Sequence, residues 1–305
     1  MGKIAFVFAG QGAQHPGMGS DLCRDFGAAR RVFEQADAIR PGTSRQCFEG
    51  TDEELKDTSN TQPCMFAVEL ATAAVLNSEG VHADMAAGFS LGELGALTYA
   101  AAMDFGTGFR LVKRRGELMQ KASSLYPTAM AAVLKLTNEQ VEALCAQFKQ
   151  IYPVNYNCPG QVSVSGAAEE MPAFSAAVKE AGGRAVPLKV AGAFHSPFMK
   201  LAEEGFVKEM DRFPFQTPHI LVYSNYTAQP YGSNVPDLLG KQLCHPVLWE
   251  QSVRNMIAAG ADTFLELGPG RTLCTLIGKI DSSVRAFPVS TTEELKKALA
   301  EVGTC

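Results

Sequence analysis

Gly88-Phe89-Ser90-Leu91-Gly92-Glu93 is the stretch that decides how this chain folds. An apolar run over residues 85–89 predicts a strand before the serine, and the small side chains after it predict a helix over 91–102. A strand, Gly-x-Ser-x-Gly and a helix together form the setting of a nucleophile elbow, a sharp turn that exposes a reactive serine. The glycines keep Cβ atoms out of the crowded turn. Ser90 would also lie at a helix N-terminus, where free N–H groups and the helix dipole favour an oxyanion.

A second interpretation of the same residues is purely structural. Ser90 and Glu93 have the spacing of a capping box, in which the serine caps the helix and the glutamate folds back onto the cap. Because small residues are common at helix starts, the motif alone does not decide between an elbow and a cap.

Length and composition indicate an ordinary globular protein. The chain has 305 residues, 46% of them hydrophobic and 19% charged, which is enough for a substantial core and for more than one structural unit. Its net charge of −5 argues against nucleic-acid binding, and no apolar run is long enough to span a membrane. The chain opens directly on an apolar strand pattern without a signal-peptide cleavage site, so we expect a cytoplasmic location.

The eight cysteines predict neither a metal site nor disulfides. None of them forms a Cys-x-x-Cys pair or a Cys/His cluster with zinc spacing, so reduced thiols in apolar surroundings are expected. They are Cys23, Cys47, Cys64, Cys145, Cys158, Cys244, Cys274 and Cys305.

A glycine-rich loop, Gly10-Gln11-Gly12-Ala13-Gln14, follows the first strand. Such a loop can present backbone N–H groups to an anion, although a plain strand-to-helix turn fits the same residues. It lacks both the P-loop and the dinucleotide-binding patterns, so we expect no nucleotide site.

Strands and helices alternate along most of the chain and predict a mostly parallel sheet with helices on both faces. The predicted strands are 3–9, 85–89, 219–223, 263–267 and 286–289. The predicted helices are 21–38, 52–58, 63–76 with Pro63 in the first turn, 91–102, 107–122, 197–213, 235–243, 250–259 and 292–302, with one more after 268–270.

A different order of elements begins near residue 128. Strands are predicted over 129–136, 151–155, 161–165 and 184–190, and helices over 138–149 and 169–181. This βαββαβ order is the ferredoxin-like arrangement. We therefore predict an α/β-hydrolase-like core over 1–126 and 196–305, with a ferredoxin-like subdomain inserted at 127–195.

Arg115 lies on the apolar side of its predicted helix. It lines up with Leu111, Leu118 and Met119, whereas Arg114 lies among polar neighbours. An unpaired buried charge is costly, so Arg115 needs a carboxylate or a similar partner. An internal ion pair or a snorkelling side chain would satisfy it as well as a bound ligand would.

A serine nucleophile needs a base, and the chain has five histidines to supply one. His195 lies where the chain returns from the inserted subdomain to the core, and clefts between such units are common places for sites. The other four histidines are at ordinary turns or segment ends, and structural or solvent-exposed roles are expected for them. They are His15, His82, His219 and His245.

Six short motifs occur in a fixed order along the chain. They are Gly10-Gln11-Gly12-Ala13-Gln14, Gly88-Phe89-Ser90-Leu91-Gly92-Glu93, Arg115-Gly116-x-x-Met119-Gln120, Asn155-x-Asn157-x-Pro159-Gly160-Gln161, Ala193-Phe194-His195 and Leu267-Gly268-Pro269-Gly270. Together they resemble the malonyl-CoA:acyl carrier protein transacylase family of fatty acid synthesis, to which acyltransferase domains of polyketide synthases are related. The resemblance covers nearly the whole chain, including the inserted subdomain.

The resemblance implies a role for each matching residue. Ser90 would be the acylated nucleophile and His195 its base, oriented by the backbone carbonyl of Gln242 rather than by an aspartate. The backbone N–H groups of Gln11 and Leu91 would form the oxyanion hole.

The resemblance also implies the substrate pocket. Arg115 would hold the malonyl carboxylate in a two-pronged pair, and Gln62 would line the same pocket. Phe194 matches the version of its motif that selects malonyl over methylmalonyl groups. Further pocket residues by this resemblance are Met119, Asn155 and Asn157.

The implied reaction is a ping-pong transfer of malonyl from malonyl-CoA through Ser90 to the phosphopantetheine thiol of an acyl carrier protein, by a monomer without a bound cofactor. An acidic carrier protein would dock on a local basic patch, with Arg184, Lys189, Lys200 and Arg271 as candidates. The sequence departs from the family at Phe89, where a histidine is frequent, and this bears on the fine contacts to substrate.

Three alternatives remain at this stage. A thioesterase or esterase of the α/β-hydrolase type shares the elbow, but it normally carries an acid between the serine and the histidine in chain order. A scaffold that binds carrier proteins would need neither Ser90, His195 nor Arg115. A transferase that serves a polyketide pathway in trans has the same motifs.

Overall fold

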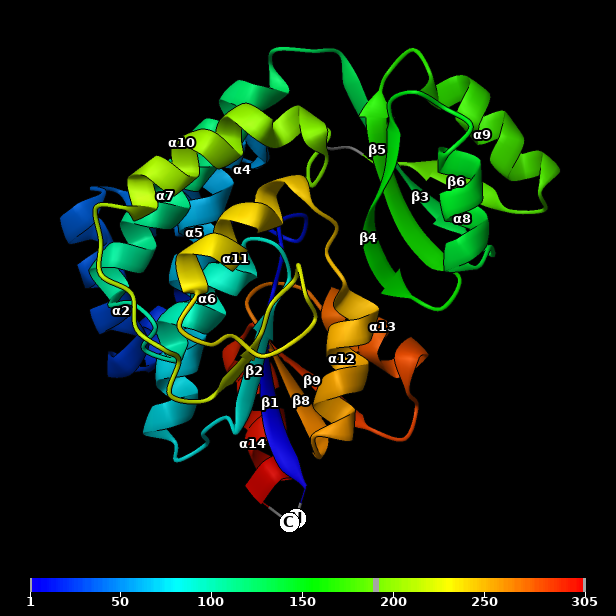
Figure 1. The fold of residues 1–305 in the computed structure, drawn as a ribbon. Coiled ribbons are helices and arrows are strands. Elements are labelled where there is room, and N and C mark those ends of the chain that lie inside the picture. Colours follow the sequence, from blue (N-terminus) through cyan, green and yellow to red (C-terminus); the bar gives the residue numbers. More distant parts are fainter. Residues whose placement is uncertain (1, 189–191, 304–305) are drawn as a thin grey trace.

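The computed structural model describes residues 2–188 and 192–303, which form two β-sheets with helices packed around them (Figure 1). The larger sheet has five strands in the order β7-β2-β1-β8-β9, and every neighbouring pair is parallel. The parallel sheet predicted for the core is therefore confirmed. Its strands are β1 (Lys3–Phe8), β2 (Met85–Gly88), β7 (Leu221–Tyr223), β8 (Ala261–Leu267) and β9 (Arg285–Val289).

The carboxyl ends of the central strands are level with one another. Phe8 of β1 is paired with Gly88 of β2 on one side and with Leu267 of β8 on the other. The loops that follow these strands therefore start at the same edge of the sheet, where ligands bind in open α/β folds.

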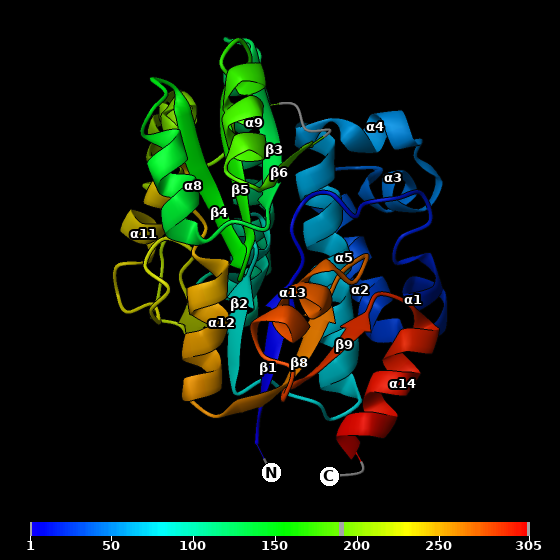
Figure 2. The ribbon, with the colours of Figure 1, turned by 90° about the vertical axis from the view of Figure 1, so that its right-hand side faces the viewer.

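Helices cover both faces of this sheet (Figure 2). Successive residues of β1 point to opposite faces, so Phe6 and Phe8 join one buried cluster whereas Ala5 and Val7 join another. The first face carries α2 (Gly27–Ile39), α5 (Thr58–Ser78), α6 (Gly92–Tyr99), α7 (Phe105–Ser123) and α14 (Thr292–Gly303), and the second carries α12 (Trp249–Ala258) and α13 (Thr272–Ile280).

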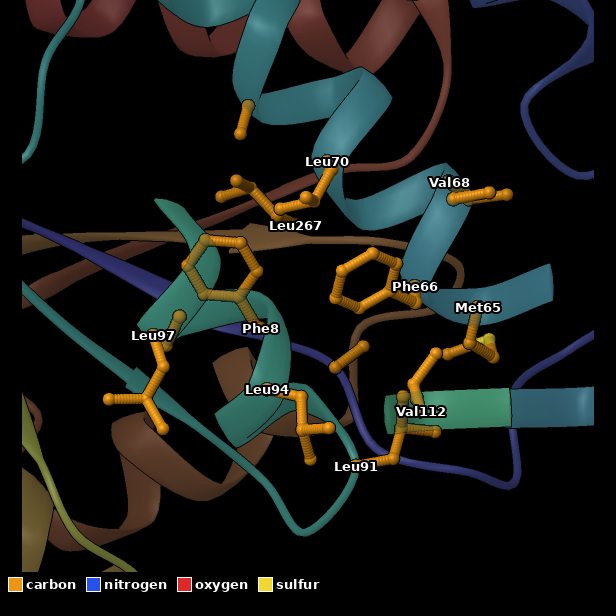
Figure 3. Close-up of a cluster of buried hydrophobic side chains, with 14 of the residues drawn as sticks. Phe8, Met65, Phe66, Val68, Leu70, Leu91, Leu94, Leu97, Val112 and Leu267 are labelled. Carbon is orange, nitrogen blue, oxygen red and sulfur yellow. The ribbon is translucent and has the colours of Figure 1, made fainter. Parts of the chain in front are cut away.

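The larger cluster fixes the helix that follows the elbow. Leu91, Leu94 and Leu97 of this segment are all buried. Figure 3 shows them in one cluster with Phe8 of β1 and Phe66 of α5. Close packing of this kind holds α6 in one place relative to the sheet edge.

The second sheet belongs to the inserted unit. Its four strands run in the order β4-β5-β3-β6 with antiparallel pairing, and two helices complete the predicted βαββαβ order. The elements are β3 (Thr128–Leu134), α8 (Asn138–Cys145), β4 (Ile151–Cys158), β5 (Gln161–Ala167), α9 (Met171–Glu180) and β6 (Arg184–Pro187). The ferredoxin-like fold is confirmed, while the exact boundaries 127 and 195 stay predictions. Lys189 and Val190, in the predicted last strand, lie outside the described residues.

The two units are joined by backbone pairing as well as by the chain connections. Val247 lies against β4, where its N–H donates to Val154 O and its carbonyl accepts from Tyr156 N, both at 2.9 Å. Asn155 forms the bridge partner of Val247. This contact fixes β4, an edge strand of the inserted unit, against the core.

The helices differ most from the sequence-based prediction in the first part of the chain. The helix predicted over 21–38 is two helices, α1 (Ser20–Asp25) and α2, because Phe26 between them is extended and is followed by Gly27, a weak helix former. The helix predicted to begin at Pro63 begins at Thr58, since Asp57 caps it by accepting from Ser59 N, and Pro63 is inside α5. A short helix, α3 (Thr43–Glu49), was not predicted.

The remaining elements surround this framework. They are α4 (Asp52–Lys56), η1 (Pro197–Met199), α10 (Lys200–Met210), α11 (Val235–Lys241) and η2 (Gln242–Cys244). Within residues 2–188 and 192–303, no helix combines the length and the apolar character that crossing a membrane requires. The seven cysteines in this part of the chain are free thiols, and Cys305 lies outside it.

Candidate active site

Ser90 lies on a tight turn between β2 and α6. Its φ of 55° is left-handed, which is unusual for a residue with a side chain. A Cβ on Gly88 would lie 1.9 Å from the carbonyl carbon of Gly92, and one on Gly92 would lie 2.3 Å from Phe8 O. The turn thus needs glycine at both positions, as expected for a nucleophile elbow.

The capping-box alternative is wrong for this serine. The Ser90 hydroxyl lies 2.7 Å from His195 Nε2 and accepts from Arg115 Nη2 at 3.1 Å, so it does not cap α6. The Glu93 carboxylate also faces away from the helix N-terminus and accepts from Asn225 N and from side chains beyond α6.

His195 is buried and has the tautomer that a base requires. Its Nδ1 lies 2.8 Å from the carbonyl oxygen of Gln242, which can only accept, so Nδ1 carries the proton and Nε2 can accept from Ser90. Burial, and then the positive charge of Arg115, lower the pKa of the imidazole to about 4. The histidine is therefore neutral near pH 7, and no carboxylate of the described residues contacts either ring nitrogen.

Arg115 is completely buried beside the serine. Its Nη1 donates to Gln62 Oε1 at 3.0 Å, and its Nη2 donates to Gln242 Oε1 at 2.8 Å as well as to Ser90. All three acceptors are neutral, so the internal ion pair considered from the sequence is absent from these contacts. Burial lowers the pKa of the guanidinium to about 10, and the charge of Glu93 opposes that shift. Arg115 therefore keeps a positive charge that no contacting group neutralises.

The two backbone N–H groups expected at the oxyanion hole are available. Gln11 follows β1 and Leu91 precedes α6, and both residues line the cavity that contains Ser90. Among the described residues, neither N–H has a hydrogen-bond partner. Free N–H groups at this place can stabilise an oxyanion that forms next to the serine.

The cavity lies between the core and the inserted unit and has a volume of about 430 Å³. Its lining brings together nearly every predicted site residue: Gln11, Gln62, Ser90, Leu91, Arg115, Met119, Asn155, Asn157, Phe194 and His195. Gln242 is completely buried behind this wall and reaches the site through its hydrogen bonds.

The predicted wall residues are held by contacts of their own. Asn157 donates to Ser163 Oγ at 3.1 Å, and Gln62 Nε2 lies 3.4 Å from Met119 Sδ. The carbonyl of Phe194 accepts from Ser165 Oγ at 3.2 Å, which ties the residue before His195 to β5.

Phe89, the departure from the family pattern, is part of the wall. Its ring packs edge-on against Trp249 at 5.5 Å between ring centres. An apolar side chain here replaces a polar one next to the nucleophile.

Asn225 is a site residue that the sequence analysis missed. Its Oδ1 accepts from Ser90 N at 2.8 Å, and its Nδ2 donates to Gly88 O at 2.6 Å, so it holds both sides of the elbow. Asn225 follows β7, the sheet neighbour of β2. The signal that could have identified it is a polar residue just after a predicted parallel strand.

Comparison with known proteins shows which family the chain belongs to. The acyl transferase domain family matches residues 5–291. The malonyl CoA-acyl carrier protein transacylase of Bacillus subtilis (strain 168) is 36% identical over 98% of this chain and 97% of its own length, and that of Escherichia coli (strain K12) is 34% identical over 98% and 99%. A polyketide-biosynthesis malonyl CoA-acyl carrier protein transacylase of B. subtilis is 37% identical over 93% of this chain and 99% of its own length.

Solved structures show the same fold throughout. The malonyl CoA-acyl carrier protein transacylase of Clostridium perfringens superposes with a TM-score of 0.96 at 33% identity, covering 99% of this chain and 98% of that one. A malonyl-transacylase in complex with its type II polyketide synthase acyl-carrier protein superposes with a TM-score of 0.94 at 34% identity, covering 98% and 99%. This chain belongs to the acyl transferase family, in its malonyl CoA-acyl carrier protein transacylase branch.

Proposed function

We propose that this chain transfers a malonyl group from malonyl-CoA to the phosphopantetheine thiol of an acyl carrier protein, through an ester on Ser90. The observation that carries the proposal is the placement of Arg115 beside the Ser90–His195 pair. A nucleophile with its base performs acyl transfer, and a buried guanidinium whose described hydrogen-bond partners are all neutral favours an acyl group that ends in a carboxylate.

In the first half-reaction, Ser90 Oγ attacks the thioester carbonyl while His195 Nε2 takes its proton. The oxyanion forms near the N–H groups of Gln11 and Leu91. When it collapses, the carbon–sulfur bond breaks and His195 gives the proton to the departing CoA thiolate. The malonyl group remains esterified to Ser90.

The second half-reaction runs the same steps with a new thiol. His195 takes the proton of the phosphopantetheine thiol, the sulfur attacks the ester, and the bond between the acyl carbon and Ser90 Oγ breaks. The proton returns to Ser90, and malonyl leaves on the carrier protein. No bound cofactor is needed in this scheme.

Arg115 provides selectivity as well as binding. A malonyl carboxylate would lie against its Nη atoms in a charge-assisted pair, whereas an acetyl group would leave the guanidinium buried without an ionic partner. Phe194 in the cavity wall would crowd a substituent on the α-carbon, so malonyl is favoured over methylmalonyl. Asn155, Asn157, Met119 and Gln62 complete the pocket.

The carrier protein, the assembly and the location belong to the same proposal. Fatty acid and polyketide carrier proteins are both candidate acceptors, since the relatives include transacylases of both kinds. Arg184, Lys200 and Arg271 are exposed and stay candidates for docking, while Lys189 lies outside the described residues. The monomeric state and the cytoplasmic location stay predictions.

Intact mass of the protein after brief incubation with malonyl-CoA tests the proposal directly. The wild type should gain the mass of one malonyl group, the Ser90→Ala variant should gain none, and added holo acyl carrier protein should discharge the adduct. Release of CoA into water without a lasting adduct would instead favour a thioesterase, and no reaction would overturn the malonyl specificity assigned to Arg115.

A further inference from the structure

Glu93 is a buried carboxylate that lies behind the elbow and does not line the cavity. Its Oε1 accepts from Asn225 N at 2.7 Å and from Tyr231 Oη at 2.8 Å, and its Oε2 accepts from Gln242 Nε2 at 2.5 Å. Because backbone and amide N–H groups can only donate, both carboxylate oxygens are committed as acceptors.

Gln242 connects this carboxylate to all three groups of the proposed reaction. Its Nε2 donates to Glu93 and to Ser90 O, its Oε1 accepts from Arg115, and its backbone carbonyl holds His195 Nδ1. The amide works only in one orientation, since a flip would set its NH2 group against the guanidinium. The acceptor at Glu93 favours the working orientation.

Burial raises the pKa of the Glu93 carboxyl to about 7, so its ionised form, present from neutral pH upward, supplies charge without blocking the site. It is the carboxylate whose charge acts on buried Arg115, yet the two side chains are separated by the amide of Gln242. The positive charge is thereby partly balanced from behind, while no carboxylate within residues 2–188 and 192–303 contacts the guanidinium directly.

We propose that Glu93 is a positioning residue. Through Gln242 it holds the side chains of Arg115 and His195 in place beside Ser90, and its charge partly balances the guanidinium without touching it. This inference rests on the proposed function, since it concerns the same site. The Glu93→Gln variant tests it because it removes the charge, and because the NH2 group of a glutamine must face a donor, either Gln242 Nε2 or Asn225 N. The first arrangement disturbs the orientation of the Gln242 amide, and in both arrangements the charge that balances Arg115 is lost.

The decisive readout is selectivity between malonyl-CoA and acetyl-CoA, measured as rates of Ser90 acylation. Disturbance of His195 lowers both rates, but disturbance of Arg115 lowers only the malonyl rate. Loss of a hydrogen bond to a charged group predicts a fall of about 10–100-fold in kcat/KM for malonyl-CoA. The malonyl-to-acetyl ratio should fall in Glu93→Gln, with a raised KM for malonyl-CoA. An unchanged ratio would overturn the proposal, whether both rates fall together or neither changes.

Glu69→Gln is the matched control, because Glu69 is equally buried but contacts no site residue through a hydrogen bond. It should leave the ratio at the wild-type value. In an Arg115→Ala background, Glu93→Gln should change the ratio no further, and a further fall would contradict the route through Arg115.

The Glu93→Asp variant keeps the proposal testable if Glu93→Gln does not fold. Its shorter side chain retains the charge but loosens the contact with Gln242, so its ratio should lie between those of the wild type and Glu93→Gln. A wild-type ratio in Glu93→Asp would then overturn the proposal. Failure of the wild type itself to form a malonyl adduct would refute the proposed function instead.

Discussion

Ser90 and His195 both adopt left-handed backbone conformations, with φ values of 55° and 59°. Such conformations cost on the order of 1–3 kcal/mol for a residue with a side chain. Both backbone polar groups of Ser90 are hydrogen-bonded to side chains: its N–H donates to Asn225 Oδ1, and its carbonyl accepts from Gln242 Nε2. The side chain therefore keeps its direction toward His195, and the strain is balanced by contacts from distant segments.

At the same scale, the His195 imidazole is expected to stay neutral well below the range in which histidines ordinarily titrate. Burial and the charge of Arg115 lower its pKa to about 4, so the neutral base persists from neutral pH down to about pH 5. Nitrogen NMR of 15N-histidine-labelled protein should show a neutral ring with its proton on Nδ1, and His195→Asn identifies the signal. An imidazolium form of this ring at about pH 6 would contradict the expectation.

At the scale of elements, the elbow depends on how closely α6 approaches the end of β1. The helix begins at Gly92, directly over the carbonyls of Phe8 and Ala9. Leu91, directly before this helix, and Gln11, which follows β1, both line the cavity. A side chain at position 92 would push the helix away from the sheet.

The Gly92→Ala variant is expected to lose stability and Ser90 acylation together. The new Cβ would meet the backbone oxygen of Phe8 at 2.3 Å, and overpacking against rigid backbone typically costs about 1–3 kcal/mol. Denaturant unfolding and the adduct assay measure the two effects. Gly278→Ala is the control: this exposed helical glycine has no atom near its Cβ position, so the variant should gain about 0.4–1 kcal/mol and keep full acylation. Equal stabilities of the two variants would refute the argument.

At the scale of the whole molecule, the cavity exists because two units meet. Ser90, Arg115 and Gln242 come from the core, and Asn155 and Asn157 come from β4 of the inserted unit. The pairing of Val247 with β4 fixes the units against each other at this place. If the two units separated, the residues of the site would therefore move apart even where each helix and strand remained folded.

Glu69 is expected to make the stability of the whole fold depend on pH. Its carboxyl is completely buried among α5, α6 and the sheet edge, and among the described residues neither oxygen has a partner. Burial therefore raises its pKa well above the ordinary 4.5. The folded protein keeps a proton that the unfolded chain releases above that value, so this contribution is complete at low pH and is lost as the pH rises toward the folded pKa.

The corresponding measurement is the free energy of unfolding of the wild type and Glu69→Gln between about pH 5 and pH 9. Glutamine cannot ionise, so the difference between the two proteins should shift in favour of the variant as the pH rises. Parallel curves would show that the pKa of Glu69 is not raised in the folded state, which would contradict the expectation.

Much of the site could be predicted where the signal was local. Gly88, Ser90 and Gly92 identified the elbow because a sharp strand-to-helix turn demands those residue types within a few positions. The helical position of Arg115 identified a buried cation for the same reason. The order of short periodic segments identified both the parallel sheet and the ferredoxin-like unit. Periodicity alone could not place every helix end, since Asp57 caps α5 and the extended Phe26 separates α1 from α2.

The contacts that sequence patterns could not predict join chain segments that are far apart in the sequence. Asn225 lies 135 residues from the Ser90 N–H that it holds, and Gln242 Nε2 lies 149 residues from Glu93, so no pattern within either segment contains the contact. Gln242 was identified only through resemblance to a family, and Glu93 had suggested no more than a helix cap. Periodicity and turn chemistry act between neighbours, and they determined the elements and the nucleophile. The tertiary structure decided the tautomer of His195, the neutral partners of Arg115 and the carboxylate behind them, because burial and charge depend on which distant groups the fold brings together.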